Sequence, residues 1–595
     1  MVRPCTQEFP DQPRTADGEP DGGGEAAESC GRMVVEAAES VPDGLVDLPT
    51  DLLAAVLAQL DARDVGRSAQ SCTILRDATH HAAILSSTAL GVALPPLYPG
   101  EGVASALRWC AAFATRSPRR ISAGASHSLA ASADGATFVW GGCAPGWDHD
   151  DDAPAVGFLG LGELDDIEAA GDPAFYTGLA IVTRPRRVDL WKETAVAEVC
   201  AGSTHSVAVD RRGGAWCWGV EYTGHPAGTH GHPDAVEVRR SGPDDDDDGD
   251  DVVRADGGGA PCSRPTPLAL GVRIVGASCG AFHTLLLADG GVLLSFGRGA
   301  EGQLGHGDRR DRATPTVVET EHLVKESGRR LRLCDVSAGA EHSVAVSDDG
   351  VAYTWGDGLW GQLGDDKQRW HRDAPTLEQA AVDTATAGVA SVVPLTKVVR
   401  DDVVRMWAAP AAVEGALTDV FVVGASAGGS HTLFFGHRRG CAEGPNVLYS
   451  CGSGALGKLG LGDERDRHLP TLVTERLRMN GFAGDSPKPS PFGGDSVKQA
   501  CAGDEHSVVL TTTGRVYTFG CGSNGRCGPG YWNRLYPDRV AVDRDVIVEI
   551  AAGEEHTLAR AADGTLYAFG ANGSGQLGIG GTVDEDIPEE VAPLP

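Results

Sequence analysis

Residues 339–356 read GAEHSVAVSDDGVAYTWG, and the pattern in this stretch decides the fold. A glycine stands three residues before His342, and an apolar run follows the histidine. Asp349-Gly350 separates that run from a second one, which ends at Trp355-Gly356. Asp-Gly between two apolar runs is a strong signal for a β-hairpin with a type I′ turn, in which both central residues have positive φ. The stretch therefore predicts two short antiparallel strands joined by a tight turn.

The same pattern occurs seven times along the chain. Each copy has a glycine three residues before a histidine, and the pairs are Gly124/His127, Gly202/His205, Gly280/His283, Gly339/His342, Gly428/His431, Gly503/His506 and Gly553/His556. Thirteen residues after the histidine, six copies have an aromatic residue followed by glycine: Trp140, Trp218, Phe296, Trp355, Phe519 and Phe569. The fifth copy has extra residues at 440–446, and Cys451-Gly452 takes the place of the aromatic pair. A unit repeated this often fixes the architecture before any single motif is considered.

The rest of each unit supplies two more strands. Gly-x-Leu-Gly follows in five copies, at 157–160, 302–305, 361–364, 457–460 and 575–578; the sixth copy is degenerate and the second lacks it. Five copies then end in Pro-x-x-Val. Each unit thus predicts about four short strands with glycine corners, which is one blade of a β-propeller. Because the pattern opens mid-unit at Ile121 and closes at Val591, we expect the two ends to complete one blade together.

These units resemble the regulator-of-chromosome-condensation repeat, and the resemblance covers roughly residues 121–595. It implies a mainly β fold, a seven-bladed propeller. The founding member of that family is a guanine-nucleotide exchange factor for a small GTPase, and many relatives use the propeller purely for binding. A plant-type ultraviolet photoreceptor shares the repeats but needs Gly-Trp-Arg-His-Thr. None of the seven pairs before the histidines is Trp-Arg, so we set that function aside.

The N-terminal region changes character twice before the repeats. Residues 1–40 are rich in Gly, Glu, Asp and Pro, which predicts a disordered tail. Residues 45–90 contain an apolar stripe at helical spacing that begins at Pro49. Residues 91–120 are a linker with a further helix expected at 103–116. The sequence therefore predicts a small all-α unit in front of the propeller.

The segment LPTDLLAAVLAQL, residues 48–60, resembles an F-box, although the later tryptophan of that family is absent. The resemblance implies that a Skp-type adaptor binds this unit and links it to a cullin ubiquitin ligase. The implied contact residues are Leu48, Pro49, Leu52, Leu53, Val56 and Leu57. About 45 residues bury little surface alone, so an apolar stripe there calls for a partner. A helical lid packed against the propeller is the alternative.

Composition narrows the classes of partner and compartment. The net charge of −33 argues against nucleic-acid backbones and anionic membranes as partners. Fifteen cysteines without a CxxC pair fit a reduced compartment, the cytoplasm or the nucleus. The N-terminus has no secretory apolar region, and no stretch approaches the roughly 20 apolar residues of a membrane span. Insertions near 148–180, 220–262, 378–420 and 476–495 are expected to be surface loops, one of them with an aspartate run at 244–248.

Nothing in the motifs predicts catalysis, a cofactor or a metal. The seven histidines occupy one repeat-equivalent position, so a metal cluster would have to unite different blades. We expect each imidazole to bond backbone groups at its own blade corner. Residues 302–305 lack the phosphate-loop pattern, and the aspartates at 244–251 lack the spacing of an EF-hand loop. The two resemblances together therefore imply a non-enzymatic substrate-recognition subunit of a cullin–RING ligase, with GTPase exchange as the alternative.

Overall fold

The computed structural model describes residues 83–87, 89, 94–95, 97, 103–114, 116, 118–142, 159–161, 181–188, 194–219, 262–319, 332–365, 411–413, 416–441, 444–474, 491–542 and 546–594. The chain divides into two compact units, Met1–Ala111 and Ala112–Pro595. Helix α5 (Val103–Ala114) confirms the helix expected at 103–116, and its Leu107 is buried with Ala83. No helix within these ranges is long and apolar enough to span a membrane. The predicted tail, nearly all of the F-box-like segment and most of the insertions lie outside the described residues.

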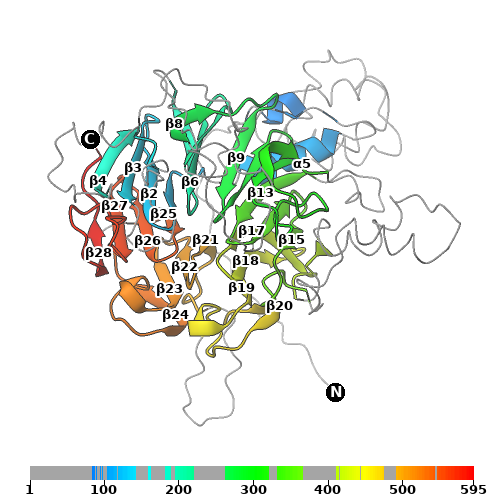
Figure 1. Ribbon diagram of the computed structural model, residues 1–595. Coiled ribbons are helices and arrows are strands. Elements are labelled where there is room, and N and C mark those ends of the chain that lie inside the picture. The colour runs from blue at the N-terminus through cyan, green and yellow to red at the C-terminus, as the bar shows by residue number, and fades with distance from the viewer. Residues whose placement is uncertain are drawn as a thin grey trace, which may run out of the picture. The chain divides into compact units, whose positions relative to one another are not determined.

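The second unit is a ring of seven four-stranded antiparallel sheets, which confirms the predicted seven-bladed propeller (Figure 1). The first strand of each blade contacts the first strands of its neighbours, so these strands line the centre of the ring. From the centre outward, blade 1 has β1 (Ile121–Ala123), β2 (His127–Ala131), β3 (Thr137–Gly142) and β4 (Ile181–Val188), and blade 2 has β5 (Val196–Ala201), β6 (His205–Asp210), β7 (Ala215–Gly219) and β8 (Cys262–Pro267). Blade 3 has β9 (Ile274–Cys279), β10 (His283–Ala288), β11 (Val292–Gly297) and β12 (Arg312–Val317), and blade 4 has β13 (Leu333–Ala338), β14 (His342–Ser347), β15 (Ala352–Gly356) and β16 (Ala411–Ala412).

The remaining three blades follow the same order. Blade 5 has β17 (Val420–Ala427), β18 (His431–Arg438), β19 (Val447–Gly452) and β20 (Arg467–Leu472), and blade 6 has β21 (Val497–Ala502), β22 (His506–Thr511), β23 (Val516–Gly520) and β24 (Arg534–Val540). Blade 7 has β25 (Ile547–Ala552), β26 (His556–Ala561), β27 (Leu566–Gly570) and β28 (Glu585–Glu590). Two short 3-10 helices, η5 (Ala455–Gly457) and η6 (Ser523–Gly525), lie between the third and fourth strands of blades 5 and 6.

The ring closes without a blade shared between its two ends, which corrects the sequence prediction. Residues from Ile121 onward already supply all four strands of blade 1, and the last unit supplies all four strands of blade 7. The seam is bridged by contacts between complete blades. The backbone N–H of Glu554 donates to the carbonyl of Gly124 at 3.2 Å, and the indole N–H of Trp140 donates to the carbonyl of Gln576 at 2.8 Å. Blades 7 and 1 therefore meet as any other neighbours do.

The hairpin turns also differ from the prediction. In blade 4 the N–H of Gly350 donates to the carbonyl of Ser347 at 2.9 Å, and Gly350 has φ +70°. Asp349 is not among the residues with positive φ, so the turn is not type I′. A type I turn followed by a glycine in the left-handed region gives this geometry, and it needs positive φ at one residue only. The dipeptide predicted the hairpin correctly but not its turn type.

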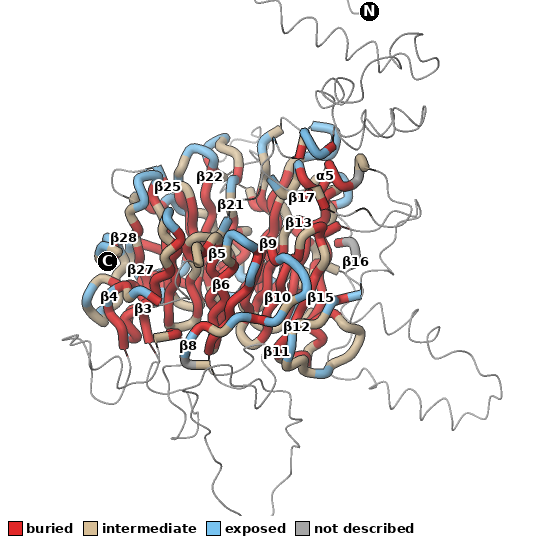
Figure 2. Tube along the Cα trace, turned by 90° about the horizontal axis from the view of Figure 1, so that it is seen from above, coloured by how far each residue is buried: buried red, intermediate tan, exposed pale blue. Residues whose placement is uncertain are grey.

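Burial follows the alternation of strands and loops. Figure 2 shows the strands largely buried and the loops at both ends of the ring partly exposed. The aromatic residues before glycine are the main packing elements: Trp140, Trp218, Phe296, Phe519 and Phe569 have no exposed surface, and Trp355 is 3% exposed. In blade 5, Cys451 pairs with Thr432 in the register where the other blades place the aromatic residue. The extra residues of that repeat lie between β18 and β19, and the register at the histidine is unchanged.

Candidate partner-binding face and arginine anchor

The seven repeat histidines form a ring of hydrogen bonds that joins each blade to the next. Each Nε2 lies 2.7–2.9 Å from a serine or threonine hydroxyl of the following blade. The pairs are His127–Ser206, His205–Thr284, His283–Ser343, His342–Thr432, His431–Ser507, His506–Thr557 and His556–Ser128. The partner is thus a side chain of the neighbouring blade, which corrects the expectation of backbone partners within the same blade.

The direction of these bonds follows from a second bond, because five of the seven hydroxyls also donate to a backbone carbonyl. Thr432 Oγ1 donates its proton to the carbonyl of Gln362 at 2.6 Å, so the Nε2–H of His342 must donate to Thr432. Complete burial lowers the pKa of His342 to about 3, which keeps the imidazole neutral. Within the described ranges, no group of three or more His, Cys, Asp or Glu side chains could hold a metal ion. The histidine ring is therefore a structural device that connects blades.

The glycine three residues before each histidine is required by a close backbone approach. A Cβ on Gly280 would lie 2.2 Å from the carbonyl oxygen of Gly339 in the next blade. That carbonyl accepts the N–H of Ala281 at 3.2 Å, and the equivalent bond joins Ala340 to Gly428. A side chain at the glycine would push neighbouring blades apart. All fourteen repeat residues named from the sequence therefore lie at contacts between blades.

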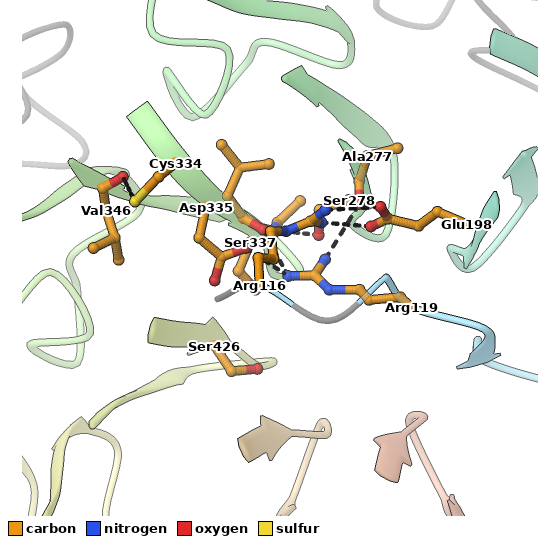
Figure 3. A network of polar contacts seen from close by, with 12 residues as sticks. Arg116, Arg119, Glu198, Ala277, Ser278, Cys334, Asp335, Ser337, Val346 and Ser426 are labelled. Atoms are coloured by element: carbon orange, nitrogen blue, oxygen red, sulfur yellow. Dashed lines mark hydrogen bonds and ion pairs between the residues drawn. The ribbon is translucent and has the colours of Figure 1, made fainter. Parts of the chain in front are cut away.

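Two arginines that precede the first strand bind the inner strands of three blades (Figure 3). Arg116 makes a bidentate ion pair with Glu198 of β5 and a further pair with Asp335 of β13 at 3.2 Å. Arg119 donates to Asp335 and to the carbonyl of Ala277 in β9 at 3.3 and 3.2 Å. Burial opposes the charge of Arg116, yet Glu198 and Asp335 hold its pKa above the ordinary value. We call Arg116, Arg119, Glu198 and Asp335 the arginine anchor.

This anchor was not predicted from the sequence, although the repeat contained a signal for it. Glu198 and Asp335 both stand four residues before the repeat glycine, and Gly276 occupies that position in the blade between them. A Cβ on Gly276 would lie 2.9 Å from Nη2 of Arg116, so the glycine makes room for the guanidinium group. Acidic residues recur at one position of the repeat, and Arg116 and Arg119 stand just before the first repeat. Together these two features could have predicted an internal ion pair.

One end of the ring carries the loops that join the first strand of each blade to the second and the third strand to the fourth. We call this end the loop end. At blades 6 and 7 it gathers carboxylates from two adjacent loops, namely Asp504, Glu505, Glu554 and Glu555. Buried cations pair with two of them: Lys458 with Glu505 at 2.8 Å, and Arg526 with Glu555 at 2.7 Å.

The other two carboxylates of the loop end hold their protons more tightly. Burial, then the nearby charge of Glu505, raises the pKa of Asp504. Burial also raises the pKa of Glu554, although Ser203 Oγ donates to its carboxylate at 2.6 Å. Large apolar side chains are exposed on the third-to-fourth-strand loops of the same end, among them Trp360 at 45% and Trp532 at 66%. An exposed apolar surface at the same end of the ring as such carboxylates is suited to binding another protein.

The six residues predicted to contact an adaptor, Leu48 to Leu57, lie outside the described residues. Their placement stays a prediction.

Comparison with known proteins agrees with this architecture. The profile of the Regulator of chromosome condensation (RCC1) repeat matches residues 290–346, 446–510, 513–560 and 563–595, and a second profile of this repeat matches 333–362, 497–526 and 547–576. The Ultraviolet-B receptor UVR8 of Arabidopsis thaliana is 29% identical over 273 residues, which cover 42% of this chain and 54% of the receptor. The E3 ubiquitin-protein ligase HERC2 of Mus musculus is 29% identical over 259 residues, 44% of this chain but 4% of the ligase.

The fold has a counterpart among solved structures. The crystal structure of Prp20p from Saccharomyces cerevisiae, a protein characterised for its binding to Gsp1p and histones, superposes with a TM-score of 0.51 at 18% identity. The superposition covers 78% of this chain and 88% of that one, and at this identity it shows the fold alone. The matched profiles, the fold and the seven-fold hydrogen-bond ring agree: this chain carries RCC1 repeats that form a seven-bladed β-propeller.

Proposed function

We propose that this protein is a non-catalytic interaction subunit of an SCF-type (cullin–RING) ubiquitin ligase. The propeller would bind a protein substrate at the loop end, and residues 45–90 would bind a Skp-type adaptor. The observation that carries the binding role is that exposed tryptophans and half-buried carboxylates occur on loops of the same end of the ring. The repeat histidines, in contrast, make hydrogen bonds that join neighbouring blades. The chain would then act by holding ligase and substrate at high effective concentration.

Guanine-nucleotide exchange on a small GTPase is the second candidate. It is supported by the fold shared with Prp20p, which has been characterised for its binding to Gsp1p. Fold alone does not determine function. Exchange would use the same loop end as a protein-binding face, so the two candidates differ in the partner and in the need for residues 45–90.

Affinity purification of the full chain distinguishes the two candidates. We expect Leu48→Ala with Pro49→Ala to abolish recovery of a Skp-type adaptor while the thermal transition of the propeller is unchanged, because the two units have separate cores. Deletion of residues 45–90 should have the same effect. Adaptor recovery that persists in the double variant contradicts the ligase proposal. Recovery of a small GTPase in its nucleotide-free form would instead support exchange.

A further inference from the structure

Exposed aromatic side chains lie beside acidic residues on the outer rim of blades 6 and 7. Tyr531 and Trp532, in the loop between β23 and β24, are 60% and 66% exposed. Ile587 on β28 of the next blade is 55% exposed. The backbone N–H of Gly530 donates to Oδ2 of Asp586 at 2.9 Å, which brings the two segments together. We call Tyr531, Trp532, Glu585, Asp586 and Ile587 the rim patch.

The fold does not require aromatic residues at these positions, because the equivalent positions of blades 3 and 5 carry charges. In three blades a side-chain oxygen in this loop accepts the backbone N–H of a glycine after the third strand; the capping residues are Asp311, Asp466 and Asn533 in blades 3, 5 and 6. The residue before the cap is an exposed arginine in blades 3 and 5, Arg310 and Arg465. In blade 6 it is Trp532. The tryptophan is therefore a property of this blade and not of the repeat.

The residue after the cap also differs in charge between blade 7 and blades 3 and 5. In blades 3 and 5 the residue after the cap is an arginine that pairs with an aspartate, Arg312 with Asp308 at 2.7 Å and Arg467 with Asp463 at 2.9 Å. In blade 7 the cap is Asp584, and the residue after it is Glu585. Strand β28 then continues as EDIPEE, so the aromatic pair of blade 6 stands beside an acidic strand.

We propose that the rim patch binds a basic peptide segment of the partner protein. A lysine or arginine stem would lie on Trp532 and Tyr531, with the cationic head against Glu585 and Asp586. Aromatic faces attract cations, and the aliphatic stems of these residues bury apolar area. Carboxylates around the aromatic pair supply the complementary charge. This inference rests on the proposed role of the loop end in binding, and it names the chemistry of the segment that is bound.

Side-chain recognition is favoured over addition of a strand to the sheet. Strand β28 is the outermost strand of blade 7, and Pro588 interrupts its row of N–H donors. Proline on an edge strand blocks pairing with another chain. The specificity would therefore come from charge and aromatic contact.

The test uses the purified full chain and fluorescence polarisation with two short labelled peptides, one of alternating arginine and glycine and one of alternating glutamate and glycine. Tyr531→Arg with Trp532→Arg gives blade 6 the residue type that blade 3 has at both positions. Its matched control is Val272→Arg with Val546→Arg, because these residues are 46% and 58% exposed and lie in loops that join one blade to the next, away from the loop end. Both doubles add two positive charges, so the change in net charge is equal.

We expect the arginine peptide to bind the wild-type chain and the glutamate peptide not to bind. The rim double should weaken binding about tenfold and the control double about twofold or less. Glu585→Gln should weaken binding more than Glu590→Gln, at the far end of the same strand. Each variant must keep the thermal transition of the wild-type propeller.

Three results would overturn the proposal. One is an equal loss in both doubles, which would mean general attraction to a chain of net charge −33. Another is absence of arginine-peptide binding, or equal binding of the glutamate peptide. The third is a wild-type dimer that the rim double converts to a monomer without affecting peptide binding, which would assign the patch to a second copy of the chain. Adaptor recovery is a separate measurement, so failure of the ligase proposal is distinguishable from failure of this one.

Discussion

Replacing His342 with alanine tests the hydrogen-bond ring at one junction between blades. His342 has no exposed surface, and its Nε2–H donates to the Thr432 hydroxyl of blade 5 at 2.9 Å. The substitution leaves that hydroxyl without its donor and opens a void. We expect the free energy of unfolding at pH 7 to fall by roughly 1–3 kcal/mol.

The pH dependence makes the prediction specific. Burial lowers the pKa of His342 from 6.5 to about 3 in the folded protein, where its Nδ1 has no hydrogen-bond partner among the described residues. Between those values the unfolded chain binds a proton that the folded chain does not, so the wild type loses stability as the pH falls below 6.5. At about 1.4 kcal/mol per pH unit, the fall from 6.5 to 5 costs about 2 kcal/mol at this residue. The variant lacks this contribution, so its deficit should shrink to near zero at pH 5.

Urea unfolding followed by tryptophan fluorescence at pH 7, 6 and 5 measures this deficit. The other six ring histidines are present in both proteins, so their contributions cancel in the comparison. Thr432→Val is the matched control: it removes the acceptor but keeps the buried imidazole, so its deficit should stay constant with pH. A deficit of His342→Ala that stays constant or widens on acidification would refute the reasoning. Stoichiometric zinc that disappears with the substitution would also refute it.

Three further predictions concern the anchor, the glycines and the last blade. Arg116→Ala should lower the free energy of unfolding by about 3–5 kcal/mol, because it leaves the carboxylate of Glu198 buried without its cation. A free energy of unfolding within about 1 kcal/mol of the wild-type value would contradict the role of the anchor. Gly280→Ala should prevent soluble expression because its Cβ would lie 2.2 Å from a carbonyl oxygen of the next blade, whereas Gly573→Ala, with open space around its Cβ, should be tolerated. Deleting residues 566–595 removes β27 and β28 and should abolish soluble expression; a soluble product with a cooperative transition would show that blade 7 is dispensable.

The repeat made much of the fold predictable from the sequence alone. Seven copies of one unit gave the number of blades, and apolar runs around Asp-Gly gave the hairpins, because both signals are local in the chain. The glycine corners were predictable for the same reason, because the positive φ of Gly302 and Gly305, +76° and +77°, is a requirement on the backbone of those residues. The F-box-like segment stays a prediction, since it lies outside the described residues.

Contacts between blades were decided only by the tertiary structure. The partner of His342 is 90 residues away, and no local pattern states which neighbour an imidazole will face. Arg116 and Asp335 are 219 residues apart and meet because the inner strands converge on the centre of the ring. Gly530 and Asp586 lie on different blades, and their hydrogen bond is one of the contacts that bring the loop of Trp532 beside an acidic strand. Periodicity fixes what each blade is, whereas the curvature that closes the ring fixes which side chains of different blades meet.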